Sequence, residues 1–305
     1  MSFSNLIATF TNNLLPIILI SGVGALFARF FQVDSRSIGR VIFYIFSPIL
    51  VFNLLLKNTL PLDAIAGTVG FALLVYLVTG VMILLITRAL RLPRPLAMAL
   101  LLTALFGNTG NYGLPLVSFA FGQDALAHAS LYFVTSSILF NSVGVLIASL
   151  GHADFKAALL GLLKVPTVYA ALLAMLLNRF HVVLPLALER TIQLAADGTI
   201  PLMLVLLGLE LARVEWGRSW SLVVVGMTLR LVAAPLIGLL LAVPFGLQGA
   251  ARQAGIVETS MPTAVTTTVL ASEYRLEPSL VTATVFLSTL LSPLTLTPLL
   301  VYLGR

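Results

Sequence analysis

Charged residues are scarce in this chain, and cysteine is absent. Only 9% of the 305 residues are charged and 59% are apolar, whereas soluble domains carry about 25% charged residues. So few charges cannot cover a water-facing surface, and most of the surface must therefore face lipid. Without cysteine the chain has no disulfide, no thiolate nucleophile and no Cys-ligated zinc or iron–sulfur site.

Patterns typical of catalytic and metal sites are also lacking. The three histidines form no HxxxH or HExxH pattern, and there is no GxSxG and no pair of aspartates in facing segments. We therefore expect neither an intramembrane enzyme nor a metal site, and no cofactor beyond a coupling ion, H+ or Na+. The 17 Lys and Arg residues exceed the 11 Asp and Glu, but they lie singly or in small groups between apolar runs. Nucleic acid is therefore not an expected partner.

Long apolar runs dominate the sequence. A helix that crosses a bilayer needs roughly 20 mostly apolar residues, and the lipid bilayer is therefore an expected partner of this chain. The first run lacks the basic region of a signal peptide and is interpreted as a retained helix. The sequence predicts an all-α polytopic membrane protein, a single transmembrane unit over 1–305. Its ten segments are 14–31, 38–56, 64–90, 96–121, 127–150, 155–180, 192–211, 220–243, 250–273 and 279–302.

The cations predict the orientation of these segments. Eleven of the 17 Lys and Arg residues lie in connections that follow odd-numbered segments, five lie on the other side, and Arg230 lies within the eighth segment. Cytoplasmic loops are enriched in Lys and Arg. We therefore expect a multi-pass protein of the cytoplasmic (inner) membrane with both termini on the non-cytoplasmic side.

The two halves of the chain carry matching landmarks. Pro48 in the second segment corresponds to Pro201 in the seventh, and Pro115 in the fourth corresponds to Pro262 in the ninth. An odd number of helices per repeat inserts the second copy upside down, an arrangement found in many transporters. Chance remains an alternative, because proline is common in membrane helices. The prediction is two inverted five-helix repeats, residues 1–150 and 155–305.

Two segments carry sequences that disfavour a continuous helix. GNTGNYGLPL (107–116) and GIVETSMPTAVTTT (255–268) are rich in glycine, polar residues and proline. If the helices unwind at Pro115 and Pro262, they cross near the bilayer centre. Their half-helix N-termini then suit an anion, and their unwound carbonyls suit a cation. The alternative is a packing kink in which small residues let helices approach closely.

A few polar residues lie deep in the apolar segments. Glu258 could carry a proton in a transport cycle, or it could be a static partner in an ion pair. Arg230 could neutralise Glu258 or hold a substrate carboxylate. Asn53 is a further binding candidate, although it could also only hydrogen-bond between helices, whereas Glu210 is interpreted as an interfacial group.

Three motifs resemble those of the auxin efflux carrier family, which includes bacterial malonate-transporter-like proteins and plant PIN-type carriers. They are YIFSPILVFN, GNTGNYGLPL and the block ETSMPTAVTTTVLASEYRLEPSLVTATVFLSTLLSPLTLTP. The resemblance implies a fold like that of bile-acid:sodium symporters. Helices 1, 2, 6 and 7 would form a scaffold. Helices 3–5 and 8–10 would form a mobile transport unit with broken, crossed helices 4 and 9.

The same resemblance implies the function. It predicts a secondary active transporter that carries a small organic anion, a mono- or dicarboxylate, by an elevator-like movement. A homodimer through the scaffold helices is expected on the same ground. Pro115 and Pro262 would be the crossover prolines, with Asn108, Asn111 and Thr263 lining the substrate site. The full expected set is Asn53, Asn108, Asn111, Tyr112, Gly113, Pro115, Ser260, Pro262 and Thr263 for the substrate, with Glu258 and Arg230 for coupling or charge compensation.

A second hypothesis has the same fold. A membrane receptor or regulator would bind an organic anion at the crossover without transporting it. The identity of the anion, the choice of proton or sodium coupling, and import or export all stay open at this point.

Overall fold

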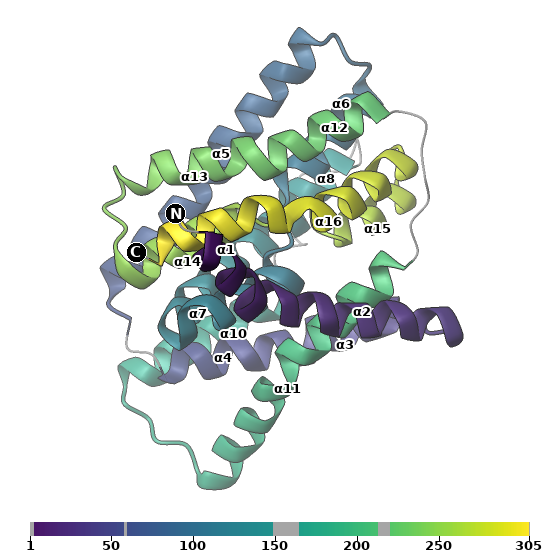
Figure 1. Cartoon of the computed structure of the whole chain (residues 1–305). Helices are drawn as coiled ribbons and strands as arrows, with labels where there is room; N and C mark the ends of the chain where they lie inside the picture. Colours follow the sequence, from purple (N-terminus) through teal and green to yellow (C-terminus); the bar gives the residue numbers. More distant parts are fainter. Residues whose placement is uncertain (1–2, 58–59, 149–164, 213–219, 305) are drawn as a thin grey trace.

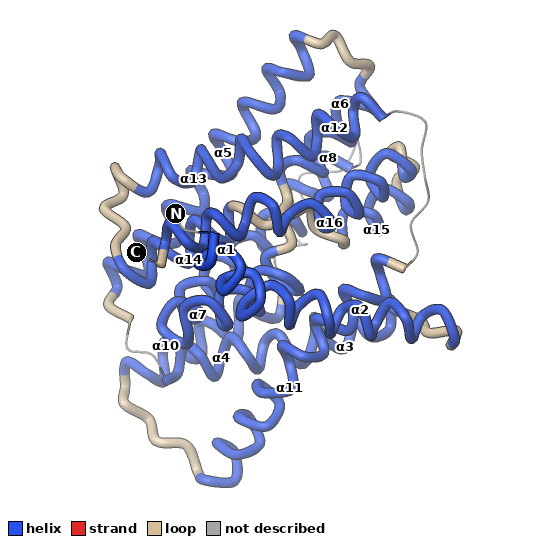
Figure 2. The backbone as a smooth tube through the Cα atoms, in the orientation of Figure 1, coloured by secondary structure: helices blue, strands red, loops and turns tan. Residues whose placement is uncertain are grey.

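The computed structural model describes residues 3–57, 60–148, 165–212 and 220–304. Over these residues the regular secondary structure is helical, with no strand apart from one isolated bridge (Figure 2). Seven helical stretches among them are long and apolar enough to cross a membrane. They are Phe3–Phe30, Ser35–Lys57, Leu62–Ala89, Thr109–Ala148, Leu186–Leu211, Trp220–Ala242 and Pro278–Leu303. The protein is a multi-pass, all-helical membrane protein, as the sequence predicts.

Several stretches consist of consecutive α-helices joined by π-helical turns, which are written η. The first half of the chain comprises α1 (Phe3–Thr9), η1 (Phe10–Leu14), α2 (Leu15–Phe30), α3 (Ser35–Val41), η2 (Ile42–Phe46), α4 (Ser47–Lys57), α5 (Leu62–Ala89), α6 (Arg94–Leu105), η3 (Thr109–Gly113), α7 (Leu114–Leu139), η4 (Phe140–Gly144) and α8 (Val145–Ala148). The second half comprises α10 (Pro166–Arg179), α11 (Leu186–Leu211), α12 (Trp220–Thr228), η5 (Leu229–Ala233), α13 (Ala234–Ala242), α14 (Gly249–Thr259), α15 (Thr266–Glu273) and α16 (Pro278–Leu303).

The 40-residue stretch from Thr109 to Ala148 is interrupted by a kink. Gly122, inside α7, has φ 76° and ψ −163°, which is not a helical conformation. A positive φ of this kind is readily adopted only by glycine. Gly122 therefore separates the second half of the expected fourth segment from the expected fifth. Each of the ten expected segments contains helical residues, although the start of 155–180 lies outside the described residues.

The helices gather in two groups. In the view of Figure 1, α2, α3, α4, α10 and α11 lie in the lower part, and α5, α6, α12, α13, α15 and α16 lie in the upper part. Within the first group, α2 packs against α11 and α4 packs against α10. Within the second group, α12 packs against α16 and α13 packs against both α5 and α14, while α7 lies centrally and packs against α14.

Glycines allow α2 and α11 to approach closely. A Cβ atom added at Gly24 would lie 2.3 Å from the carbonyl oxygen of Val205, and one added at Gly208 would lie 1.8 Å from that of Ser21. Larger residues could not occupy either position without separating the helices. Small residues at such contacts are the usual basis of helix association in lipid, where no hydrophobic effect drives the helices together.

Candidate functional site

Two interrupted helices meet in the interior of the protein. α6 ends at Leu105 and α14 ends at Thr259, and the extended residues that follow each helix pair with one another. Gly107 and Thr263 form an antiparallel bridge. The amide of Asn108 donates to the carbonyl of Pro262 at 2.7 Å, and the amide of Ala264 donates to the carbonyl of Phe106 at 2.9 Å. These bonds satisfy backbone groups that a break in lipid would otherwise leave unpaired.

The position of one break differs from the prediction. The ninth segment unwinds at Pro262, as expected, but the fourth unwinds at 106–108 and not at Pro115. Pro115 is instead the second residue of α7. η3 runs directly into α7, so the helix that begins at Thr109 continues through Pro115. Gly107, and not Pro115, therefore lies at the crossover.

Thr263 stabilises the crossover through its backbone and its side chain. Its amide donates to the hydroxyl of Ser288 at 3.1 Å, and its hydroxyl donates to the carbonyl of Thr103 at 3.0 Å. Both the backbone amide and the hydroxyl of Thr263 are thus engaged, and the side chain is fully buried. Thr263 holds the two breaks together and does not line the cavity described below.

Arg230, in η5, is buried against the same breaks. Its Nε donates to the carbonyl of Met261 at 2.6 Å, one terminal nitrogen donates to that of Thr259 at 2.9 Å, and the other donates to that of Leu105 at 3.3 Å. A Cβ atom at Gly107 would lie 2.0 Å from the guanidinium. Glycine at this position is what admits the arginine.

Glu258, near the end of α14, is completely buried. Neither of its carboxylate oxygens has a hydrogen-bond partner among the described residues. Gly113 lies directly against it, since a Cβ there would be 2.3 Å from Oε2. The glycines of the GNTGNYG motif therefore make room for two charged side chains from the second half. The hydrogen bonds of Arg230 go to backbone carbonyls and not to Glu258.

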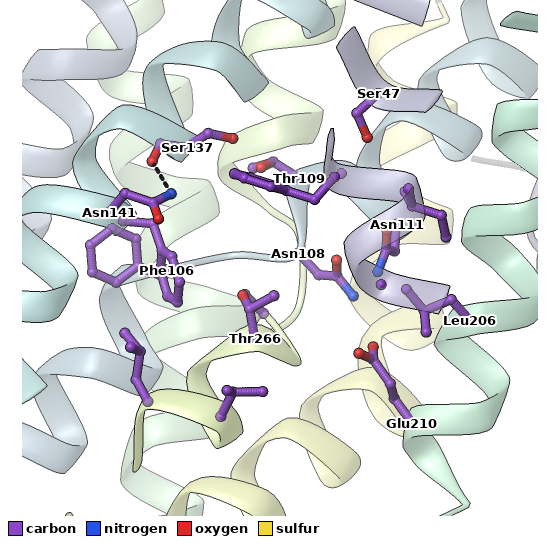
Figure 3. A pocket seen from close by; sticks show the side chains of 18 of the residues that line it. Ser47, Phe106, Asn108, Thr109, Asn111, Ser137, Asn141, Leu206, Glu210 and Thr266 are labelled. Atoms are coloured by element: carbon purple, nitrogen blue, oxygen red, sulfur yellow. Dashed lines mark hydrogen bonds between the residues drawn. The ribbon is translucent and has the colours of Figure 1, made fainter. Parts of the chain in front are cut away.

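A cavity of about 730 Å³ lies beside the crossover. One wall comes from α3, η2, α4 and α11, and the other comes from the first break, η3, the second part of α7, η4 and α15. Figure 3 shows Asn108, Asn111 and Glu210 directed toward the same space. The side-chain nitrogen of Asn108 is buried and has no hydrogen-bond partner among the described residues.

The N-terminal ends of two half-helices face this cavity. η3 follows Asn108 and continues into α7, and α15 begins at Thr266, which lines the cavity. The first N–H groups of a helix have no intrahelical partner, and the N-terminus carries a positive partial charge. Arg36 and Arg40 also line the cavity, as do Glu210 and Glu273.

Of the expected binding residues, only Asn108 and Asn111 line the cavity. Tyr112 is buried and accepts a hydrogen bond from the hydroxyl of Ser292 at 3.1 Å. The Ser260 hydroxyl donates to the carbonyl of Ile256 at 2.6 Å. Gly113, Pro115 and Pro262 are also absent from the lining.

Asn53 lies elsewhere, in α4. Its side-chain nitrogen donates to Oε1 of Gln193 at 3.4 Å, and Lys57 donates to the same oxygen. This contact joins α4 to α11 and serves packing between those helices. Asn53 does not belong to the cavity.

Several residues of the cavity were not expected from the sequence. Arg36 and Arg40 are among the eleven cations whose placement predicts the orientation of the segments, and the sequence predicts only an interfacial role for Glu210. Asn141 donates to the carbonyl of Ser137 at 2.9 Å, as an asparagine in a helix often does, yet it also lines the cavity (Figure 3). The signal in the sequence was the presence of small polar residues within the second and fifth segments, such as Ser47, Ser137 and Asn141.

Comparison with known proteins identifies the family. Residues 9–300 match the family model described as membrane transport protein. An uncharacterized transporter of Methanothermobacter thermautotrophicus is 26% identical over 263 residues, which is 85% of this chain and 86% of that protein. An uncharacterized transporter of Methanocaldococcus jannaschii is 24% identical over 291 residues, 91% of this chain and 92% of that one. The rice auxin efflux carrier component 3a is 28% identical over 144 residues, 44% of this chain and 23% of the carrier. The chain therefore belongs to the membrane transport protein family of the auxin efflux carriers, and it is a membrane transporter.

Proposed function

We propose that this protein is a secondary carrier that binds a small organic anion, a mono- or dicarboxylate, in the cavity beside the crossover. The observation that carries the proposal is the Asn108 amide, a buried donor without a partner, at the point where two half-helices begin. A carboxylate accepts hydrogen bonds and needs donors arranged in advance. Unpaired N–H groups at helix N-termini supply such donors.

The charges and size of the cavity agree with this class of ligand. Two arginines, Arg36 and Arg40, and two acidic residues, Glu210 and Glu273, line the cavity, and the positive ends of the helix N-termini favour an anion beside them. Ligand pockets of about 300–1,000 Å³ accept drug-sized molecules. A volume of about 730 Å³ therefore has room for an acid as large as an indole carboxylate as well as for malonate.

The arrangement of helices supports an elevator-like movement. The group that contains α2, α4, α10 and α11 would be the scaffold, and the group that carries the crossover would move. One wall of the cavity comes from each group, with Ser47 and Leu206 on the first and Asn108 and Thr266 on the second. A ligand held at that boundary moves against the scaffold when the second group slides.

Ten spans in two inverted repeats account for the observed helices. Each half contributes one interrupted helix, and Gly122 divides the longest helical stretch into two spans. The cavity is lined by residues of 35–47 and by the last turns of α11 and α15, on the side where Lys and Arg are more numerous. By the positive-inside rule this side is cytoplasmic, so the cavity opens inward and both termini lie outside.

Flux into proteoliposomes tests the proposal. Malonate, malate and an indole carboxylate would be supplied in radiolabelled form under imposed proton, sodium or voltage gradients. We expect saturable uptake of one acid, an at least tenfold loss in Asn108→Ala, and normal uptake in Asn13→Ala. Asn13 is the matched control because its amide donates to the carbonyl of Thr9, away from the cavity.

The outcomes separate the two hypotheses. Wild-type uptake by Asn108→Ala would remove the proposed site. Saturable binding of an acid without any counterflow would favour the receptor. No binding and no flux of any acid, in folded protein, would refute a carboxylate substrate.

A further inference from the structure

Three backbone carbonyls at the ends of broken helices converge on one cationic side chain. Leu105 is the last residue of α6, Thr259 is the last residue of α14, and Met261 lies in the second break. All three accept hydrogen bonds from the guanidinium of Arg230. One side chain from η5 therefore binds the C-terminal ends of both interrupted helices.

Such a place suits a cation. The C-terminus of a helix carries a negative partial charge, and its last carbonyls lack intrahelical partners. In carriers with discontinuous helices, unwound carbonyls and half-helix C-termini coordinate the coupling ion. A planar guanidinium with five donors can satisfy several carbonyls at once and keeps its charge when buried.

The chain is shaped to admit this side chain. Gly107 lies at the bridge, where any Cβ would come within 2.0 Å of the guanidinium. Arg230 is only 3% exposed, so its charge is shielded from water. Glu258 is the nearby carboxylate, but neither of its oxygens accepts a hydrogen bond from Arg230 or any other described residue. Hydrogen bonds to backbone carbonyls therefore hold Arg230 in place, and an ion pair with Glu258 does not.

We propose that the guanidinium of Arg230 takes the place of a coupling cation. The backbone carbonyls at the crossover form a cation site, and the covalently attached charge of Arg230 fills it. This inference rests on the proposed carrier function and deepens it, because it predicts that anion transport needs no sodium ion at the crossover. Arg230 is a positioning residue. It keeps the two half-helix ends together so that the opposite half-helices can present their N-termini to the cavity.

The test removes the arginine and returns a cation from solution. Arg230→Ala and the control Arg252→Ala each remove one positive charge. Arg252 is a suitable control because its guanidinium donates a hydrogen bond to the hydroxyl of Tyr302 near the protein surface, away from the crossover. Thermal unfolding of each purified variant in detergent would be followed with millimolar guanidinium, sodium or choline chloride at equal ionic strength. This measurement needs no substrate, so its result does not depend on the carrier hypothesis.

We expect Arg230→Ala to melt at a lower temperature and to recover several degrees with guanidinium, and to a smaller extent with sodium, but not with choline. Wild type and Arg252→Ala should show no recovery with either cation. In flux assays, wild-type uptake should be the same in sodium and choline, whereas uptake by Arg230→Ala should be at least tenfold lower and partly restored by guanidinium.

Three results would overturn the inference. The first is that no cation stabilises the Arg230→Ala protein, and the second is that this protein melts at the wild-type temperature. The third is wild-type flux that stops when sodium is replaced by choline. If Arg230→Ala does not fold, Arg230→Lys serves in its place and should melt below wild type with a smaller guanidinium response. An Arg230→Lys protein identical to wild type in melting and flux would also contradict the role of the planar guanidinium.

Discussion

Gly107→Ala should lower the stability of this protein, although it adds only one methyl group. The new Cβ would lie 2.0 Å from a terminal nitrogen of Arg230 and 2.7 Å from the central carbon of the guanidinium. Ordinary contacts begin near 3.4 Å. The guanidinium or the bridge must therefore move by about 1.4 Å, the difference between 3.4 and 2.0 Å.

The cost follows from the hydrogen bonds that this movement breaks. A shift of that size takes the nitrogen that donates to Thr259 at 2.9 Å out of hydrogen-bonding range and strains the bond to Met261 at 2.6 Å. Buried hydrogen bonds from charged donors contribute about 1.5–3 kcal/mol each. Loss of one or two such bonds lowers the free energy of unfolding by about 1.5–6 kcal/mol.

Thermal unfolding in detergent, followed by circular dichroism, measures this loss. Gly80→Ala is the matched control, because its Cβ would meet Leu105 at an ordinary 3.7 Å inside α5. A glycine-to-alanine change in a helix stabilises by about 0.5–1 kcal/mol, so the control should melt at or above the wild-type temperature. A Gly107→Ala protein that melts with its control would refute the reasoning, because Arg230 would then have moved without loss.

Three further predictions follow from the same structure. Gly113→Ala would place a Cβ 2.3 Å from Oε2 of Glu258. It should destabilise the protein by about 1–3 kcal/mol through overpacking, and unchanged thermal unfolding would contradict the contact. Arg40→Gln removes one cation from the cavity, so the KM for the anion should rise several-fold in saturation uptake assays; an unchanged KM would exclude Arg40 from binding. The hydrogen bond from the Ser37 hydroxyl, above all, lowers the pKa of the Asp34 carboxyl below its ordinary value near 3.8. A lowered pKa means that Asp34 stabilises the start of α3 at neutral pH and ceases to do so as pH falls through that lowered value. The difference in melting temperature between wild type and Asp34→Ala should therefore be constant above about pH 4 and vanish in stronger acid; a constant difference in strong acid would contradict it.

The helical segments could be predicted because lipid constrains the backbone so strongly. Every N–H and C=O in hydrocarbon needs an internal partner, so each long apolar run must be helical. The regions of the two breaks could be predicted for a related reason. GNTGNYGLPL and the residues around Pro262 combine weak helix formers with polar side chains that lipid would not tolerate.

The residue at which the first helix breaks could not be predicted from local sequence. It depends on pairing between Gly107 and Thr263, far apart in the chain, and on the arrival of Arg230 from a third helix. Pro115 has the composition of a breaking residue, but the helix that begins at Thr109 continues through it.

The residues that line the cavity could not be predicted from the sequence for a different reason. Arg36, Arg40 and Glu210 lie at segment ends, where charged residues are common and ordinarily face water. Only the packing of α3 and α11 around the crossover places them beside Asn108 and Asn111. Tyr112 and Ser260 belong to the expected substrate set, yet both side chains are buried and neither lines the cavity.

The bridge between Gly107 and Thr263 has a consequence for how the protein is made. Gly107 leaves the ribosome about 155 residues before Thr263, its partner in the bridge. At roughly 5–20 residues per second, that interval lasts about 8–30 s. Throughout that interval the peptide groups of 106–108 lack their hydrogen-bond partners in the second break, and Gly107 lacks Arg230 for most of it. Newly made first halves must therefore be sheltered by the insertion machinery or by water until the second half arrives, and truncation before residue 262 should leave a product that is rapidly degraded.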